Sequence, residues 1–593
     1  CIFDYCFLSS PYVSLLRRPS WVYKCQPNEG CQREGRTTNP GKGGETYFDS
    51  LTLCWTVCGR SGGIWPKPVT AVLSAALVKI HPINVRYDLS DSPAETHSLL
   101  ATMSQVATAN LVAECGGNVT TPSDLPVVVY ISVSSPDLRQ IWDTNEEYTL
   151  DVRNKKDSVA VHVSAETVYG ARHGLETFTQ LVAPDRPEYT DGDCGLYLIS
   201  GAKIRDKPAY KHRGLVLDTS RNFVPLESIK KQIDAMATTK MNVLHWHVTD
   251  SHSFPLESSR VPQLTKYGAY SSGEIYSTAE VRALVAYARA RGVRVVVEID
   301  APAHAGNGWQ WGNEYGLGNL AVCVNEPVWR KFCIQPPCGQ LNPANQQMYR
   351  VLGNLYRDIA EMVPQPALFH MGGDEVFLPC WNSSEEILTY MDSKGYTRSP
   401  EGLIELWAEF HAKALAMWDE EVKAVGGDSD MPVMLWSSEL TQADRISRYL
   451  NKDRYVIEVW EPMDSPLLDK LLKLGYRVIS VPKDVWYLDH GFWGKTQFSN
   501  WRRMYDHRVP KASNLMLGGE VAMWSEYIDV QGLDTRIWPR AASVAERLWA
   551  NPESPPSAAE QRMQRLRARL AARGLRPDAL APEWCAQHAA KCL

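Results

Sequence analysis

Apolar runs alternate with amphipathic stretches through the second half of the chain. Eight short apolar runs occur there, at 214–217, 243–248, 293–299, 367–371, 433–436, 455–459, 478–481 and 515–524. Short runs of this kind are typical of buried parallel strands. Patterns with a helical period lie between them, at 228–239, 278–291, 346–362 and 405–425, and 541–549 is predicted to be the last barrel helix. The alternation predicts an α/β fold, a (β/α)8 TIM barrel over residues 207–593.

An open doubly wound sheet is the alternative to the barrel. Such a sheet usually carries a glycine-rich phosphate loop after its first strand, and none follows 214–217. Two regions precede the predicted barrel. Residues 1–63 are polar and rich in glycine and cysteine, which predicts a disulfide-linked N-terminal extension. Residues 64–206 hold a strand pattern at 127–133 and a helix pattern at 167–181, and they predict a small α+β domain.

Polar residues cluster where the predicted barrel strands end. The carboxyl ends of the strands meet on one face of a barrel, and active sites lie on that face. Carboxylates accept hydrogen bonds from hydroxyls and aromatic rings cover C–H surfaces, so this set predicts a site for a neutral polyhydroxylated ligand. Its members are Arg213, Asp218, His245, His247, Asp250, Glu298, Asp300, His304, Asp374, Glu375, Trp436, Glu458, Trp460, Trp486, Tyr487, Asp489, Glu520, Trp524 and Glu526.

Asp374 and Glu375 are the centre of this set. They follow the apolar run at 367–371 and the pair Gly372-Gly373. Successive strand residues point to opposite faces, so both acids serve one pocket only if the strand ends at this point. Most adjacent acid pairs are solvated surface groups, and the apolar strand before this pair distinguishes it.

Composition excludes several classes of function. The chain has 593 residues, 44% hydrophobic and 22% charged, as is typical of globular proteins with two or three domains. The net charge of -6 offers no basic face to nucleic acid or to an anionic membrane. No apolar run approaches the roughly 18 residues of a membrane span.

The 14 cysteines indicate an oxidising compartment. Ten of them form local groups, which favours disulfides; zinc is the alternative, but no Cys-x2-Cys pair is present. These ten are Cys25, Cys31, Cys54, Cys58, Cys323, Cys333, Cys338, Cys380, Cys585 and Cys592. The triplets that begin at Asn118 and Asn382 match the N-glycosylation pattern. Together these features predict a secreted protein, with a lysosomal location as the alternative.

Several blocks resemble one known family when they are taken together. They are 213–222, His245-Trp246-His247-Val248-Thr249-Asp250, Asp300-Ala301-Pro302-Ala303-His304, His370-Met371-Gly372-Gly373-Asp374-Glu375 and Trp538-Pro539-Arg540-Ala541. In this order they resemble the family 20 glycoside hydrolases, the β-N-acetylhexosaminidases. The segment 169–177 extends the resemblance to the small domain, which is zincin-like in that family. The N-terminal cysteines and the segment 336–343 are similar to the arthropod chitooligosaccharide-degrading branch.

The resemblance implies substrate-assisted catalysis, in which the substrate's own acetamido oxygen is the nucleophile. Glu375 is then the general acid and base, with His304 and Asp250 as a relay behind it. Asp374 orients the acetamido group, and Tyr487 hydrogen-bonds its oxygen. The resemblance implies neither a metal nor another cofactor.

The family pattern also assigns the sugar-binding residues. These are Arg213, Asp489, Glu526, Trp407, Trp436 and Trp524. The implied reaction removes a terminal GlcNAc, or alternatively GalNAc, from chitooligosaccharides or from N-glycans. A loop cysteine of the best-known insect members is absent after Asp489, so Trp493 and Trp501 stay alternatives for stacking on a second sugar. The sequence leaves the oligomeric state undecided, and a homodimer is one alternative because many relatives are dimers.

Two other functions compete with this interpretation. One is a sugar-binding relative that has lost turnover, although every implied catalytic position carries the required residue type. The other is a metal-dependent barrel hydrolase that uses His247, His304 and Asp374 as ligands. An assay with an aryl β-GlcNAc tests the first alternative, and a chelator tests the second.

Overall fold

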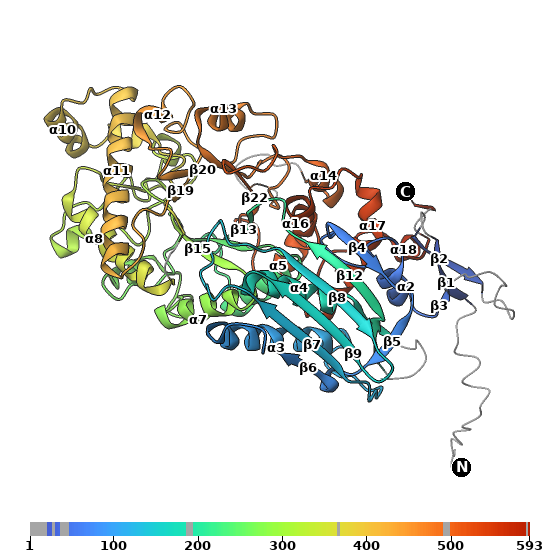
Figure 1. The fold of residues 1–593 in the computed structure, drawn as a ribbon. Helices are drawn as coiled ribbons and strands as arrows, with labels where there is room; N and C mark the ends of the chain where they lie inside the picture. Colours follow the sequence, from blue (N-terminus) through green and yellow to red (C-terminus); the bar gives the residue numbers. More distant parts are fainter. Residues whose placement is uncertain are drawn as a thin grey trace, which may run out of the picture. The chain divides into compact units, whose positions relative to one another are not determined.

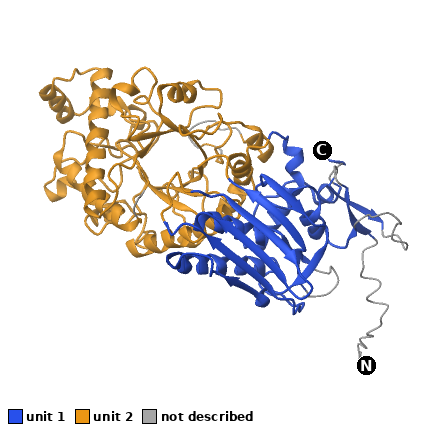
Figure 2. Ribbon diagram, in the orientation of Figure 1, with its two compact units in different colours: residues 1–138, 145–207, 553–593 blue, residues 139–144, 208–552 orange. Residues whose placement is uncertain are grey.

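The computed structural model describes residues 21–26, 30–35, 47–185, 194–364, 368–489, 491, 498–588 and 591–592. The chain divides into two compact units, which Figure 2 shows in two colours. Unit 1 contains residues 1–138, 145–207 and 553–593, and unit 2 contains residues 139–144 and 208–552. No described helix is both long and apolar enough to cross a membrane.

Unit 2 is a closed barrel of eight parallel strands in sequential order (Figure 1). The first strand closes on the last through pairs such as Leu215 with Val521. The observed strands coincide with the predicted apolar runs, apart from Ala367, which lies outside the described residues, and the fold class is confirmed. The strands are β13 (His212–Asp218), β14 (Val243–Thr249), β15 (Arg294–Ile299), β18 (Phe369–His370), β19 (Val433–Trp436), β20 (Tyr455–Val459), β21 (Arg477–Ser480) and β22 (Met516–Met523).

Helices follow the strands, and sequence signals mark several of their ends. Ser277 and Glu280 form a reciprocal capping box at the start of α7, and the Asn345 side chain caps α8. The main helices of unit 2 are α5 (Leu226–Thr238), α7 (Thr278–Arg289), α8 (Gln346–Met362), α10 (Glu385–Lys394), α11 (Pro400–Ala424), α13 (Leu467–Leu474), α14 (Trp501–Asp506), α15 (Leu533–Ile537) and α16 (Arg540–Ala550). A long excursion between β15 and α8 includes the small sheet of β16 (Ala321–Val322) and β17 (Gln340–Leu341).

Unit 1 contains a six-stranded mixed sheet with two helices, α3 (His97–Ala113) and α4 (Val168–Gln180). Its strand order is β4-β12-β8-β9-β7-β6. Alternate residues of β7 are buried, as its apolar alternation requires. The strands are β4 (Thr70–Leu73), β6 (Val85–Asp88), β7 (Val127–Val133), β8 (Tyr148–Asn154), β9 (Val159–Ala165) and β12 (Gly201–Asp206). Two three-stranded sheets complete the unit, built from β1 (Trp21–Gln26), β2 (Gly30–Gly35) and β3 (Tyr47–Phe48), and from β5 (Leu77–Ile80), β10 (Val182–Asp185) and β11 (Gly195–Ile199).

The C-terminal segment differs from the expectation that the barrel domain runs to residue 593. Residues 553–593 group with unit 1 instead. The reason is the helix α17 (Glu560–Ala572), whose buried Arg565 and Arg569 both form ion pairs with Glu114 at the end of α3. A hydrophobic pattern does not register such pairing, because it is made by charged residues.

Six disulfides join the cysteines of the described residues. The predicted groups pair internally, and Cys115 and Cys194, which the sequence left unassigned, pair with each other. Cys1 and Cys6 lie outside the described residues. The other pairs are Cys25–Cys58, Cys31–Cys54, Cys323–Cys380, Cys333–Cys338 and Cys585–Cys592.

Candidate active site

The acid pair follows β18, where regular strand structure ends. Gly372 and Gly373 have φ values of 62° and 89°, in the left-handed region that favours glycine. A Cβ at Gly372 would lie 1.9 Å from Oδ1 of Asp300, so only glycine fits there. Glu375 itself has a φ of 47°. This turn in the backbone interrupts the strand alternation at the two acids.

His304 connects Glu375 to a buried carboxylate. Its Nε2 lies 3.3 Å from Oε2 of Glu375, and its Nδ1 lies 3.2 Å from Oδ2 of Asp250. Burial disfavours the charged imidazolium, but the carboxylates of Asp250 and Asp300 outweigh it and hold the pKa of His304 well above its usual value. The three predicted relay residues therefore form one continuous chain of contacts.

The carboxylate of Asp374 has one oxygen without a hydrogen-bond partner among the described residues. This atom, Oδ1, is buried. Burial raises the pKa of Asp374 to about 6; the His304 charge opposes this rise, and the Glu375 charge adds to it. Oxygen atoms of Asp374 and Asp300 lie within 4.8 Å of each other and of a nitrogen of His304. Buried polar atoms normally have partners, so this oxygen marks a place for a hydrogen-bond donor from a ligand.

Tyr487 and Asp489 come from the loop after β21. Tyr487 pairs with Ala522 of β22 in an isolated bridge, which fixes its backbone beside the last strand. Burial raises the pKa of Tyr487 well above its usual value, and the charges of Asp489 and Asp374 contribute. Burial and the nearby charge of Glu526 raise the pKa of Asp489 to about 6. The acids and this phenol therefore share one electrostatic environment.

Two tryptophans at the carboxyl ends of barrel strands lie close together, with their rings tilted by 50°. Trp436 ends β19, and its indole N–H donates to Oε1 of Glu298 at 2.6 Å. Trp524 follows β22, with its ring centroid 6.0 Å from that of Trp436 and 6.2 Å from that of Tyr487.

Trp407 lies on α11 and is fully buried. One turn further along the helix, the imidazole of His411 lies 2.8 Å from where a Cβ of Gly373 would stand. This face of α11 therefore packs against the backbone that carries the acids. The Nε1 of Trp407 is buried and has no hydrogen-bond partner among the described residues.

The structure corrects one predicted sugar contact. Arg213 lies near the start of β13, at the opposite end of the strand from Asp218. Its guanidinium is buried and donates to the carbonyl oxygens of Lys240 and Tyr210. Active sites of such barrels lie at the carboxyl ends of the strands, so Arg213, near the amino end of β13, lies away from a ligand beside Asp374.

Arg221 is the arginine that the site contains. Its Nη2 lies 2.9 Å from Oδ2 of Asp250, and its Cζ lies 5.1 Å from the centroid of the Trp524 ring. Glu526 shares this surrounding: burial raises its pKa, and the charge of Arg221 opposes the rise. Arg221 belongs to the same sequence block as Arg213, and its place just after the strand's carboxyl end was the available signal.

A buried network of histidines and carboxylates lies within the barrel. Glu298 Oε2 accepts from Nδ1 of His247 at 2.7 Å and from Nε2 of His245 at 3.0 Å. His245 also contacts Glu520 at 3.0 Å. Burial lowers the pKa of His247, but Glu298 and Asp250 outweigh this effect and raise it to about 10. The His-x-His motif is therefore bonded to carboxylates in the barrel wall.

The metal-binding alternative does not match this geometry. Among the described residues, the groups whose potential ligand atoms converge include Asp300 with His304 and Asp374, and separately His247 with Asp250 and Asp300. His247, His304 and Asp374 do not form one such group. Both nitrogens of His304 already face carboxylates, which occupy the positions that a metal would need.

Three further predictions concern residues outside this cluster. Trp501 is only 4% exposed and packs against Tyr505 in α14, so it offers no free face for a second sugar. Trp493 lies outside the described residues. Asn118 and Asn382 are both exposed. Their glycosylation stays a prediction, and their exposure is compatible with it.

The comparisons with known proteins agree with this geometry. Residues 210–552 match the glycosyl hydrolase family 20 catalytic domain, and residues 64–181 match a β-acetyl hexosaminidase-like domain. The chain is 37% identical to a chitooligosaccharidolytic β-N-acetylglucosaminidase of Bombyx mori, over 96% of this chain and 95% of that one. It is 38% identical to the enzyme of the same name from Ostrinia furnacalis, over 92% and 91%.

Among solved structures, a chitobiase of Flavobacterium johnsoniae superimposes with a TM-score of 0.68 at 25% identity, covering 86% of this chain and 73% of that one. A family match over more than half of the chain, together with relatives similar over nearly all of it, establishes the assignment. The chain belongs to glycosyl hydrolase family 20, the β-N-acetylhexosaminidases.

Proposed function

We propose that the protein removes single GlcNAc residues from the non-reducing ends of chitooligosaccharides, with retention of configuration at the anomeric carbon. One observation carries the mechanism: a buried Oδ1 of Asp374, without a partner among the described residues, stands in sequence next to the carboxyl of Glu375. An acetamido N–H is the donor that this oxygen needs. GlcNAc supplies such a group at C2, beside the bond to be cleaved.

The first half of the reaction breaks the glycosidic bond. Asp374 accepts the acetamido N–H and turns the amide so that its carbonyl oxygen attacks C1. As the C1–O bond breaks, Glu375 gives its proton to the departing oxygen, which leaves as the hydroxyl of the shortened chain. The products are an oxazolinium ion, the free leaving sugar and the Glu375 carboxylate. The anionic Asp374 stabilises the positive charge of the oxazolinium ring, and the Tyr487 hydroxyl donates to the oxygen that came from the acetamido group.

The second half restores the enzyme. Water attacks C1 from the face that the leaving group vacated, and Glu375 takes a proton from that water. The oxazolinium ring opens to the acetamide, and the sugar leaves as the β-anomer. His304 and Asp250 keep the carboxyl of Glu375 in reach of both oxygens, through contacts of 3.2 and 3.3 Å.

The remaining polar residues bind the hydroxyls of the terminal sugar. Asp489 and Glu526 are acceptors for hydroxyl protons, and Arg221 takes the donor role that the sequence assigned to Arg213. Trp436, Trp524 and Trp407 cover the C–H faces and the acetamido methyl group. A small pocket beside Glu375 is lined by His304, Ile334 and Pro337, and we place the leaving sugar there.

The choice of substrate rests on the relatives. Their printed names give chitooligosaccharides as substrates, and the chain matches them over more than nine-tenths of its length. An N-glycan with terminal GlcNAc is the alternative. A secreted location with glycans on Asn118 and Asn382 accords with six disulfides among the described residues.

The anomer that is released first tests the proposal. The purified protein is mixed with chitotetraose, and early products are followed by NMR and by chromatography. We expect single GlcNAc units that appear first as the β-anomer and shorten the chain stepwise. Release of the α-anomer, or of internal fragments, would overturn the proposal. A branched N-glycan assayed in parallel decides between the two substrate classes.

A further inference from the structure

The backbone that carries Glu375 lacks strand pairing on its downstream side. β18 ends at His370, and residues 371–377 form no helix or strand. The left-handed φ of 47° at Glu375 is unfavourable for a residue with a side chain, at a cost of about 1–2 kcal/mol. Such a conformation persists only where surrounding contacts impose it. The contacts just after Glu375 therefore decide where its carboxyl lies.

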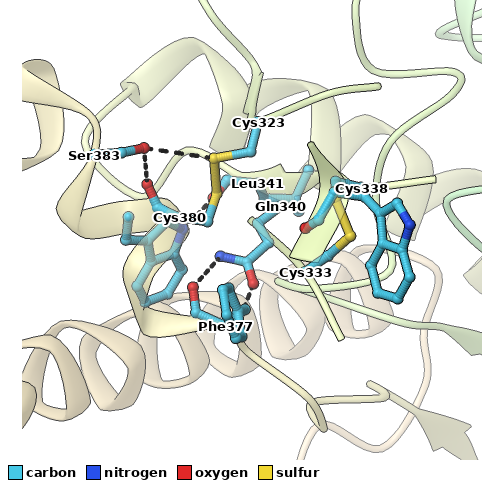
Figure 3. The surroundings of a disulfide bond; sticks show 10 residues. Cys323, Cys333, Cys338, Gln340, Leu341, Phe377, Cys380 and Ser383 are labelled. Atoms are coloured by element: carbon cyan, nitrogen blue, oxygen red, sulfur yellow. Dashed lines mark hydrogen bonds between the residues drawn. A yellow bond between two sulfur atoms is a disulfide. The ribbon is translucent and has the colours of Figure 1, made fainter. Parts of the chain in front are cut away.

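One side chain amide supplies those contacts. Oε1 of Gln340 accepts the backbone N–H of Phe377 at 2.5 Å, and Nε2 of Gln340 donates to the carbonyl oxygen of Phe377 at 3.3 Å. Figure 3 shows this amide beside the backbone of Phe377. It bonds to both the N–H and the carbonyl oxygen of that residue, as the backbone of a neighbouring strand would do. Gln340 is 2% exposed, so water does not compete for these bonds.

The strand that carries Gln340 also holds the loop of His304. The N–H of Leu341 donates to the carbonyl oxygen of Pro302 at 2.7 Å. The carbonyl of Gly339 accepts the N–H of Ala305 at 3.1 Å. β17 therefore lies against the segments of both His304 and Glu375. The distance between their side chains depends on this short strand.

Covalent links hold this arrangement in place. The disulfide Cys323–Cys380 joins the segment beside β16 to α9 (Leu378–Asn382), directly after Phe377 (Figure 3). Cys333–Cys338 closes a short loop just before Gln340. The indole of Trp381 adds a hydrogen bond to the carbonyl of Leu341 at 3.1 Å. The backbone position of Gln340 is thus restrained from both sides.

We propose that Gln340 is a positioning residue for the general acid: its amide holds the Phe377 backbone so that the Glu375 carboxyl stays beside His304 and reaches the departing oxygen. The proposal rests on the proposed function, because it requires that Glu375 donates a proton. Losing the amide leaves the substrate's acetamido contacts with Asp374 in place, although Gln340 also lines the pocket beside Glu375. Proton transfer from Glu375 becomes slower, because a displacement of its carboxyl by about 1 Å costs up to about 100-fold in rate.

The test compares two leaving groups. Cleavage of chitobiose needs a proton on the departing sugar oxygen, whereas 4-nitrophenyl β-GlcNAc releases a stable phenolate that needs little help. The ratio of their kcat values reports the need for a proton, and KM is measured separately because Gln340 lines the pocket that we assign to the leaving sugar. For Gln340→Met, which keeps length without hydrogen bonds, we expect chitobiose cleavage to fall about 10- to 100-fold and aryl cleavage to fall less than about 3-fold. Gln340→Asn, with a shortened amide, is expected to lie between this variant and the wild type.

Two controls separate the possible failures. Trp381→Phe removes the neighbouring hydrogen bond to Leu341 but keeps the Gln340 amide, so it is expected to lower the melting temperature and to change the ratio much less than Gln340→Met does. Glu375→Gln must change the ratio strongly, and if it does not, the acid assignment itself is wrong. Suppose that Glu375→Gln changes the ratio, but that Gln340→Met and Gln340→Asn either slow the cleavage of both substrates equally or slow neither. The role of Gln340 is then overturned, and the proposed function stands.

Discussion

Each compact unit buries a carboxylate, and the two carboxylates are in opposite states of pairing. In unit 1, Glu114 is buried between Arg565 at 2.7 Å and Arg569 at 3.2 Å. Burial alone would raise the pKa of Glu114, but the two arginines outweigh it and lower it. In unit 2, burial raises the pKa of Asp374 to about 6, and its Oδ1 has no partner among the described residues.

The difference in pairing distinguishes a carboxylate with a structural role from one that is suited to bind a ligand. A buried carboxylate with matched cations completes its hydrogen bonds within the protein and contributes to stability only if both partners remain. A buried carboxylate oxygen without a hydrogen-bond partner costs stability and persists where a ligand supplies the missing donor. Substitutions in the two regions should therefore have opposite effects on stability.

The largest effect is expected in the barrel. Asp374→Asn keeps the shape of the side chain but removes the charge that stabilises the oxazolinium ion, so kcat for chitobiose is expected to fall by about 1,000-fold. Substrate should still bind, with a KM within a few-fold of the wild type. Steady-state kinetics measure both values. Near-normal turnover would show that Asp374 does not orient the acetamide.

The counterpart in unit 1 is Glu114→Ala. This change leaves Arg565 and Arg569 buried without their anion, and the unfolding free energy is expected to fall by about 3–5 kcal/mol. The folded fraction should retain the wild-type kcat. Thermal melting and active-site titration measure the two quantities. Asp151→Asn is the matched control, since its ion pair with the exposed Arg153 is worth less than about 1 kcal/mol.

The two arginines of the first strand block give the third prediction. Arg221→Lys removes the planar fork beside Asp250, and KM is expected to rise about 10- to 100-fold. Arg213→Lys should leave KM unchanged and lower the melting temperature, because the guanidinium of Arg213 donates to backbone carbonyls and lies over the Trp549 ring. Equal effects on KM would contradict the placement of Arg213 outside the site.

The smallest effect is a pH dependence of stability. The pKa of Asp374 is about 6 in the folded protein against an ordinary value of 3.8, so folding favours its protonated form. Its stabilising contribution is fully present below pH 3.8 and is lost as pH rises through about 6. Asp374→Asn should therefore be more stable than the wild type at pH 7, by about 1–2 kcal/mol, with the gain absent at pH 3.5. Melting curves at the two pH values measure this.

The same ionisation limits activity from the other direction. In the proposed function Asp374 and Asp489 act as anions, and both have a pKa of about 6, so kcat/KM is expected to decline as pH falls below that value. Retention of this decline in Asp374→Asn would assign it to Asp489. A gain of stability that does not vary with pH would contradict the linkage to Asp374.

Sequence analysis predicted the barrel well because its strands are buried on both faces. The apolar runs at 243–248 and 455–459 correspond to β14 and β20 almost residue for residue. The contacts of Asp250, His304 and Glu375 also agree with the sequence, since residues at strand ends must meet on one face. Their catalytic roles stay proposals until variants are measured.

Other features left no trace in hydrophobic periodicity. Arg213 and Arg221 lie eight positions apart on the same block, and only the direction of the strand tells which one faces the site. The pairing of α17 with unit 1 depends on charged residues, which a helical pattern treats as solvent-facing. Gln340 is 35 positions from Glu375, and no spacing rule connects a glutamine on a short strand with an acid on another segment.

One comparison of substrates tests the central claim, that the ligand's acetamide is the nucleophile. Wild-type protein is assayed with 4-nitrophenyl β-GlcNAc and with 4-nitrophenyl β-glucoside, which differ at C2 alone. If the acetamide attacks C1 while Asp374 holds its N–H, kcat/KM for the glucoside is expected to be lower by at least about 1,000-fold. Comparable rates would contradict the account, because the glucoside has no amide to attack its own anomeric carbon.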